Sequence, residues 1–232
     1  MIRIFVETLA PGSLAIAGDE HHYLGRVRRA RVGDAIELVD PAGRRATATI
    51  ATMTANDTTV TVGEVDVAGP VIPRIQVLVP LIKGDRMDAC LEKLVEAGVD
   101  HVIVWPAERS VVKLDGDKRQ ARLGHYTAVL AAGARQSGAP APAIAYAASL
   151  RAAVQGVGEG ARLVLDGRAE RAAAPSDSLI TVVSGPEGGL SPGELDLLAT
   201  ERFTGFGLGP RVLRAETAPV IAVAILRAAT GT

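Results

Sequence analysis

The sequence predicts an α/β protein with a smaller β-rich part ahead of it. Up to about residue 70 the apolar segments are short, rich in Val, Ile and Thr, and separated by turn formers such as "PAGR" and "AND". Beyond "AGPVIP", apolar strands alternate with longer helical patterns, which is typical of βαβ units in a mostly parallel sheet. We therefore expect two domains, residues 1–70 and residues 71–232.

The first part is expected to be a small β-barrel or sandwich. Its strands are predicted at residues 3–7, 35–40, 45–53 and 59–67, and a helix-like segment over residues 19–31 interrupts them. The second part is predicted to hold strands at residues 74–81, 99–105, 161–166, 179–185 and 206–209, with helices at residues 86–98, 122–136, 192–203 and 216–230. Residues 138–149, "GAPAPAIAYAAS", are expected to form a loop with strand character.

The pattern of residues 86–98 predicts a helix with one buried face. Five apolar residues recur at i, i+3, i+4, i+7 and i+8: Met87, Cys90, Leu91, Leu94 and Val95. Gly98 then supplies a C-terminal stop. This placement makes Cys90 a packing residue in preference to a nucleophile. Because it is the only cysteine, an internal disulfide and a cysteine-clustered zinc site are excluded.

Composition limits the partners and the compartment. The 232 residues are 48% hydrophobic with a formal net charge of -1, so a nucleic-acid partner would meet a local basic patch and not the whole surface. No window reaches the roughly 18 consecutive apolar residues of a membrane span, and the start, "MIRIFVETLAPG", lacks the order of a signal peptide. We expect a cytoplasmic protein that contacts no membrane and binds no metal.

Residues 184–194, "SGPEGGLSPGE", lie where a strand is expected to meet the next helix. Ser191 as N-cap, Pro192 as the first helical residue and Glu194 at N3 form an S-x-x-E capping box. The glycines before them occupy the usual ligand crevice of an open α/β sheet. They match neither a phosphate loop nor a dinucleotide fingerprint, and Glu187 would repel a phosphate. Two interpretations remain open, a ligand without phosphate or merely a tight turn.

Residues 208–225, "LGPRVLRAETAPVIAVAI", are a second unusual segment. Arg211 and Arg214 come shortly before Glu216 and Thr217, which open the final apolar helix. Two arginines and a glutamate at a helix start can be a solvated cap. The combination of charge with close-packed glycine favours a site instead.

These two segments resemble the 16S ribosomal RNA uracil-N3-methyltransferase family, of the SPOUT class of S-adenosylmethionine-dependent RNA methyltransferases. So do "LIKGDRMDACLEKLVEAGVDHVIVWPAERSVVK" and "HHYLGRVRRARVGD", and the resemblance covers nearly the whole chain. It implies a PUA-like, RNA-binding β-barrel at the N-terminus and a C-terminal α/β domain with a parallel sheet and a deep trefoil knot. It also implies a homodimer with the final helix at the interface. The implied reaction is methylation of N3 of a uridine in 16S rRNA of the small ribosomal subunit.

The resemblance also implies a set of site residues. S-adenosylmethionine carries a sulfonium and no phosphate, so a cradle of glycine backbone with a nearby carboxylate suits it better than a cationic phosphate loop. The residues expected to bind it are Leu165, Ser184, Gly185, Pro186, Glu187, Gly188, Leu208, Gly209, Val212, Leu213, Thr217 and Ala218. The proton on uridine N3 must leave, and we expect Arg214 to stabilise the developing anion and Glu216 to act as the base. Alternatively, Arg214 binds a phosphate and Glu216 caps the last helix.

RNA contacts are expected on a basic helical face. If residues 19–31 are helical, His22, Arg26 and Arg29 fall at i, i+4 and i+7, with a solvated basic face as the alternative. Lys83 and Arg109 are further RNA contacts expected under the resemblance. Aromatic residues make up only 3% of the chain, so recognition is expected to depend on RNA shape and phosphates.

The chain also departs from the family's pattern. Arg28 stands where the family usually has leucine, and Arg135 and Ala139 replace the acid and the arginine of a common E-Q-S-x-R. A contact made elsewhere by that acid and arginine is therefore not carried over. Two other classes of function remain open. One is a nucleotide-using α/β enzyme such as an oxidoreductase, although the absence of both phosphate fingerprints weighs against it. The other is an RNA-binding protein without catalysis.

Overall fold

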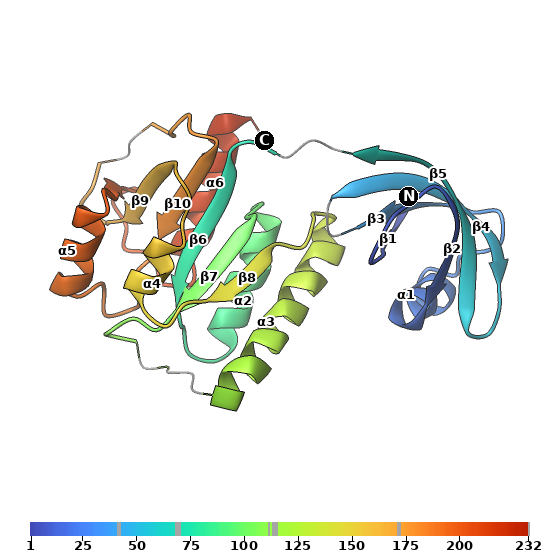
Figure 1. Ribbon diagram of the computed structural model, residues 1–232, viewed down its shortest axis with the longest axis horizontal. Helices are drawn as coiled ribbons and strands as arrows, with labels where there is room; N and C mark the ends of the chain where they lie inside the picture. The colour runs from blue at the N-terminus through green and yellow to red at the C-terminus, as the bar shows by residue number, and fades with distance from the viewer. Residues whose placement is uncertain (41–42, 68–70, 111, 113–115, 171–172, 232) are drawn as a thin grey trace. The chain divides into compact units, whose positions relative to one another are not determined.

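The structure, a computed structural model, describes residues 1–232 apart from 41–42, 68–70, 111, 113–115, 171–172 and 232. The chain divides into two compact units, one of Met1–Gly69 with Gly138–Pro140 and one of Pro70–Ser137 with Ala141–Thr232 (Figure 1). Each unit contains its own sheet. None of the helices in the described ranges combines the length and the apolarity that a membrane crossing requires.

The first unit is built on a five-stranded mixed sheet in the order β1-β3-β4-β5-β2. Its strands are β1 (Ile2–Phe5), β2 (Gly12–Ala17), β3 (Ala35–Val39), β4 (Arg44–Met53) and β5 (Asp57–Val67). β1 runs parallel to β3, and the other pairs are antiparallel. Ala46, Ala48 and Ile50 of β4 are buried because alternate residues of a strand point to the same face. The predicted β-rich first part is confirmed.

The helical segment of this unit differs from the single helix predicted over residues 19–31. A short α1 (Gly18–His22) passes directly into a π-helical turn, η1 (Tyr23–Val27). In η1 the Arg28 amide donates to the Tyr23 carbonyl at 2.9 Å, a bond from residue i+5 to residue i. Arg29 follows with a left-handed φ of 52° and lies outside the helix.

Burial explains the wider turn. Leu24 and Ala30 both belong to the core of the first unit. Residues six apart lie on different faces of a regular α-helix, which has 3.6 residues per turn. The π-turn and the left-handed Arg29 together allow both side chains to reach the core. The expected single face of His22, Arg26 and Arg29 is therefore wrong, although all three residues are exposed.

The second unit contains a six-stranded sheet in the order β11-β9-β10-β6-β7-β8, and every pair of neighbours is parallel. The strands are β6 (Arg74–Pro80), β7 (His101–Trp105), β8 (Ala143–Tyr146), β9 (Ala161–Leu165), β10 (Leu179–Val183) and β11 (Thr204–Phe206). The predicted parallel sheet is confirmed. The trefoil knot implied by the resemblance stays a prediction.

At the centre of this sheet, β6 pairs with β10. The Gln76 side-chain amide donates to the Thr181 hydroxyl at 2.8 Å, a buried bond between residues 105 positions apart in the chain. From β6 the chain continues through β7 and β8 on one side, whereas β10, β9 and β11 lie on the other. In an open α/β sheet, ligands bind at the carboxyl ends of strands near such a change of direction.

Helices cover both faces of the sheet. They are α2 (Asp85–Glu96), α3 (Gly116–Ser137), α4 (Leu150–Gln155), α5 (Pro192–Thr200) and α6 (Ala218–Thr230). α4 and α5 share a buried cluster with one face, and α2 and α6 contact each other behind the sheet in Figure 1. The predicted buried face of α2 is confirmed, since the five residues predicted to form it are all buried. α4 was not predicted because its six residues give too short a pattern.

A buried arginine fixes α6 to the amino-terminal edge of the sheet. The Arg227 guanidinium donates to the carbonyl of Gly98 at 2.8 and 2.9 Å and to that of Pro73 at 2.6 Å. It also pairs with the Asp100 carboxylate at 2.6 Å. That same carboxylate oxygen accepts the Ile75 amide at the start of β6, at 2.6 Å. Each of the three guanidinium nitrogens thus has a hydrogen-bond partner in the interior.

Candidate active site

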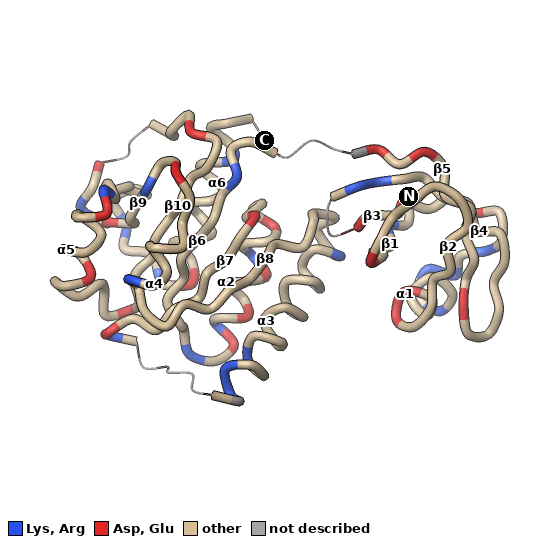
Figure 2. The backbone as a smooth tube through the Cα atoms, viewed as in Figure 1, with Lys and Arg blue, Asp and Glu red and all other residues tan. Residues whose placement is uncertain are grey.

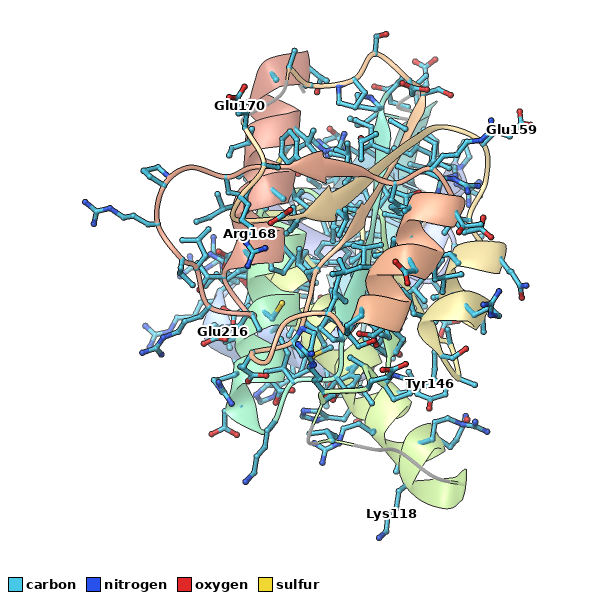
Figure 3. All side chains as sticks on the ribbon, turned by 90° about the vertical axis from the view of Figure 1, so that its left-hand side faces the viewer. Lys118, Tyr146, Glu159, Arg168, Glu170 and Glu216 are labelled. Atoms are coloured by element: carbon cyan, nitrogen blue, oxygen red, sulfur yellow. The ribbon has the colours of Figure 1, made fainter. Side chains whose placement is uncertain are left out.

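A cavity of about 830 Å³ lies at the carboxyl ends of β9, β10 and β11, which are neighbours on one side of the sheet. Its walls come mainly from three segments, within residues 164–168 at the end of β9 and after it, within 185–190 after β10, and within 206–218 around and after β11. In Figure 3, Glu159 before β9 is near the top, whereas Tyr146 at the end of β8 and Glu216 are in the lower half. The carboxyl edge of the sheet therefore faces downward in that view.

The glycine-rich turn after β10 ends in the predicted capping box, which is confirmed. The Ser191 hydroxyl accepts the Glu194 amide at 3.1 Å, and the Glu194 carboxylate accepts the Ser191 amide at 2.7 Å. Earlier in the turn, the Gly189 amide donates to the Pro186 carbonyl at 2.8 Å. Gly189 has a φ of 70°, a conformation that glycine adopts without the penalty of a side chain.

Three side chains tie this turn to neighbouring segments. Glu194 uses its second oxygen to accept the Glu108 amide at 2.9 Å. Arg109 donates through Nη1 to the carbonyls of Gly188 at 3.0 Å and Leu190 at 3.3 Å. Arg86 and Glu187 form an ion pair at 2.9 Å, with each side chain about half exposed. The charge of Glu187 is therefore shared with Arg86 and is not free for a ligand alone.

Most residues expected to bind the cofactor line this cavity. Those that do are Leu165, Gly185, Pro186, Glu187, Leu208, Gly209, Val212, Leu213 and Ala218. Ser184, Gly188 and Thr217 do not. A Cβ atom on Gly188 would lie 3.3 Å from the Arg109 Cβ, so that position faces the arginine. Ser184 is buried, and its hydroxyl has no hydrogen-bond partner in the described part of the chain.

The two residues expected to be catalytic are placed differently. Arg214 lines the cavity with its side chain 81% exposed, whereas the Glu216 side chain is only 14% exposed and does not line it. Their charged groups lie 3.9 Å apart. Glu216 also acts on Cys90 of α2, since burial and then the charge of Glu216 raise the pKa of the Cys90 thiol to about 12. This geometry suits Arg214 as a cation at the cavity but does not bring Glu216 to a substrate there.

The residues expected to contact RNA are spread over both units. Lys83 is exposed just before α2, and Arg109 lies at the cavity. In the first unit, Figure 2 marks Lys or Arg positions in blue along the backbone near α1, and His22 and Arg26 are exposed. The RNA role of these residues stays a prediction.

Three charged residues at the cavity were not expected from the sequence. They are Arg86, Asp166 and Arg168, whereas Arg211 belongs to the segment already expected to form a site, although no role was assigned to it. Asp166 directly follows β9, and its carboxylate accepts the Arg168 amide at 2.9 Å. The sequence contained a signal for Asp166 and Arg168, because they lie at or just after the end of a predicted strand and the carboxyl ends of neighbouring parallel strands meet at one edge of the sheet. Arg86 had no local signal, since its partner Glu187 is far away in the chain.

Comparison with known proteins decides the family. Residues 70–227 match the family model described as the RNA methyltransferase domain, and residues 16–62 match the one described as the RNA methyltransferase PUA domain. The chain belongs to this family of RNA methyltransferases. A relative from Mycobacterium tuberculosis, "Ribosomal RNA small subunit methyltransferase E", is 36% identical over 94% of this chain and 88% of its own length. The Bacillus subtilis protein of the same name is 28% identical, with 97% and 96% covered.

Two solved structures agree with this membership. The Neisseria gonorrhoeae "Ribosomal RNA small subunit methyltransferase E bound to S-adenosyl methionine" superposes with a TM-score of 0.84 at 26% identity, covering 98% of this chain and 97% of that one. A Legionella pneumophila methyltransferase "in complex with the bound cofactor SAM" gives a TM-score of 0.84 at 27% identity, with the same coverage. Membership of the RNA methyltransferase family leaves the oxidoreductase alternative without support.

Proposed function

We propose that this protein transfers a methyl group from S-adenosylmethionine to N3 of a uridine in 16S rRNA of the small ribosomal subunit. The observation that carries the proposal is the cavity at the ends of β9, β10 and β11, in a chain whose fold matches solved relatives described with that cofactor over nearly their full length. The names of the curated relatives supply the substrate class, and the sequence resemblance supplies the atom.

The residues at the cavity fit such a cofactor. A volume of about 830 Å³ lies within the usual range for small-molecule sites, roughly 300–1,000 Å³. Leu165, Leu208 and Leu213 offer apolar walls, and the glycine turn offers backbone groups that can approach a ligand closely. Ser184, whose buried hydroxyl has no partner in the described ranges, stands at the start of that turn but does not line the cavity. When bound, S-adenosylmethionine supplies an electrophilic methyl group on a sulfonium.

Within this reaction, Arg214 is assigned the stabilisation of negative charge on the uracil ring. Arg214 lines the cavity, and its cationic guanidinium is suited to stabilise negative charge there. Glu216 holds a carboxylate 3.9 Å from that guanidinium and thereby favours its orientation. The base that removes the N3 proton is left unassigned. Arg214→Ala should lower kcat by roughly 100-fold, the size seen on removal of one donor to a developing anion, and an unchanged kcat would remove Arg214 from the chemistry.

We further propose that two copies pair through α6, as the resemblance implies. The face of α6 turned away from the sheet carries a shallow hollow lined by Ile221, Ala224, Ile225, Ala228 and Ala229. Ala224→Asp places a charge on this exposed face without filling the core. It should yield folded monomers with weakened activity, whereas Ala132→Asp on exposed α3 should leave the assembly unchanged. Sedimentation measures whether each variant is a monomer or a dimer. A fully dimeric Ala224→Asp protein would refute pairing through α6.

We assign RNA binding to residues 1–70 and methyl transfer to residues 71–232, and we place the reaction in the cytoplasm because the proposed substrate is ribosomal RNA.

The decisive test is mass mapping of methylated nucleosides in small-subunit RNA from cells with and without this gene. Loss of one N3-methyluridine is the expected result. An unchanged set of methylated nucleosides would refute the proposed target, and titration calorimetry with S-adenosylmethionine, NAD and ATP would test the cofactor separately.

A further inference from the structure

We propose that the turn at residues 107–110, which follows β7, is a brace for the glycine-rich turn, and that Arg109 is a positioning residue for cofactor binding. This inference rests on the proposed function and reassigns a residue expected to contact RNA. Its contacts lead to the backbone of the turn after β10, on a segment separated from Arg109 by about 80 residues.

The brace is itself firmly held. The Ser110 amide donates to the Ala107 carbonyl at 3.0 Å, which closes the turn. The Ser110 hydroxyl, which is buried, donates to the carbonyl of Leu81, the residue directly after β6. Glu108 donates its amide to the buried carboxylate of Glu194. Residues 107–110 are thus fixed to the sheet on one side and to the start of α5 on the other.

Arg109 extends from this fixed base over the glycine-rich turn. One nitrogen, Nη1, donates to the carbonyls of both Gly188 and Leu190, so a single charged group bridges two positions on either side of Gly189. Hydrogen bonds from a charged donor are stronger than neutral ones. The glycines at 185, 188 and 189 otherwise lose more backbone entropy on ordering than any other residue type. The arginine therefore supplies order that the sequence of the turn lacks.

The position of Gly188 agrees with this role. An added Cβ there would lie 3.3 Å from the Arg109 Cβ and 3.6 Å from its Cδ. Glycine at this position therefore lets the arginine stem pass close to the turn. Both residues act on the same backbone, and that backbone contributes Gly185, Pro186 and Gly189 to the cavity. Removing the Arg109 guanidinium should consequently lower cofactor affinity in preference to RNA affinity.

Three variants test the proposal in the full-length protein. Arg109→Ala should weaken S-adenosylmethionine binding by about tenfold, the scale of one lost charge-assisted hydrogen bond. Arg109→Lys keeps a charged donor and should recover most of that affinity. Arg151→Ala, an exposed arginine of α4 in the same unit, is the matched control and should change nothing. Calorimetry measures cofactor affinity, filter binding at several salt concentrations measures RNA affinity, and thermal unfolding without cofactor monitors the fold.

The expected result is a selective loss of cofactor affinity in Arg109→Ala, rescued by lysine, with RNA affinity and its salt dependence unchanged. Weaker RNA binding with a shallower salt slope and normal cofactor affinity would overturn the proposal and make Arg109 an RNA contact. A lower melting temperature without cofactor, unrescued by lysine, would make it a general stabiliser and also overturn the proposal. Failure of the unaltered protein to bind S-adenosylmethionine would overturn the proposed function and this inference together.

Discussion

Replacing Arg227 by methionine removes the buried guanidinium of α6 while keeping an unbranched side chain of similar length. The change deletes the donors to Gly98 and Pro73 and leaves the carboxylate of Asp100 without its cation. The Arg227 side chain is 9% exposed and that of Asp100 is 27% exposed, so water can replace only part of what is lost. Removing one partner of a buried pair typically costs about 3–5 kcal/mol.

That loss should be visible in simple unfolding experiments. Each kcal/mol shifts the melting temperature of a domain of this size by about 2–4 °C, so Arg227→Met should melt about 6–20 °C lower. Circular dichroism during heating gives the shift, and urea titration gives the free energy of unfolding. Arg151→Met is a matched control, since exposed positions usually change stability by less than about 0.5 kcal/mol. A loss below about 1 kcal/mol in Arg227→Met would refute the reasoning from the buried charge.

Three other substitutions or treatments give further predictions. The Cys90 thiol, with its pKa raised to about 12 by burial and the Glu216 charge, should resist alkylation at pH 8 in the native protein and react once urea unfolds it; rapid native reaction would contradict its packing role. Burial, and then Arg74, lower the pKa of His101, so the unfolded chain binds that proton more tightly and stability should fall as the pH drops below about 6.5. His101→Gln should flatten the melting temperature between pH 7 and 5, and an unaltered pH profile would count against this. In Gly207→Ala the new Cβ would overlap the Ala169 carbonyl oxygen and lie 2.8 Å from the carbonyl carbon, so we expect the free energy of unfolding to fall by about 1–3 kcal/mol and cofactor binding to weaken. Urea titration measures the stability and calorimetry the binding. Wild-type values for both would show that the backbone here moves enough to accommodate the methyl group.

Short-range patterns predicted local structure well. The buried face of α2 and the capping box of α5 depend on residues three or four positions apart, and both are present. The helix predicted over residues 19–31 failed because tertiary burial of Leu24 and Ala30 decided the backbone there. Periodicity alone contains no information about a core that strands elsewhere in the chain supply.

The candidate site, like the fold, was predictable from the sequence only in part. Sequence position and resemblance indicated the turn after β10 and the segment after β11, and the cavity lies between them and β9. The partners of Arg86 and Arg109 were beyond prediction because each is far away in the chain. Glu216 follows Arg214 closely in sequence, yet its side chain is largely buried and does not line the cavity. Neighbours in sequence at a helix start can thus face different surroundings.

The central pairing of β6 with β10 has a kinetic consequence. Their contact residues Gln76 and Thr181 are 105 positions apart, so a long loop must close before the two strands can meet. Sheets that depend on such distant pairings form slowly, whereas helices form within microseconds. The cavity borders the end of β10 and cannot acquire its shape until that loop has closed. A refolding chain should therefore recover its helical circular dichroism well before it can bind a ligand. The interval between these two signals measures how long the sheet takes to close.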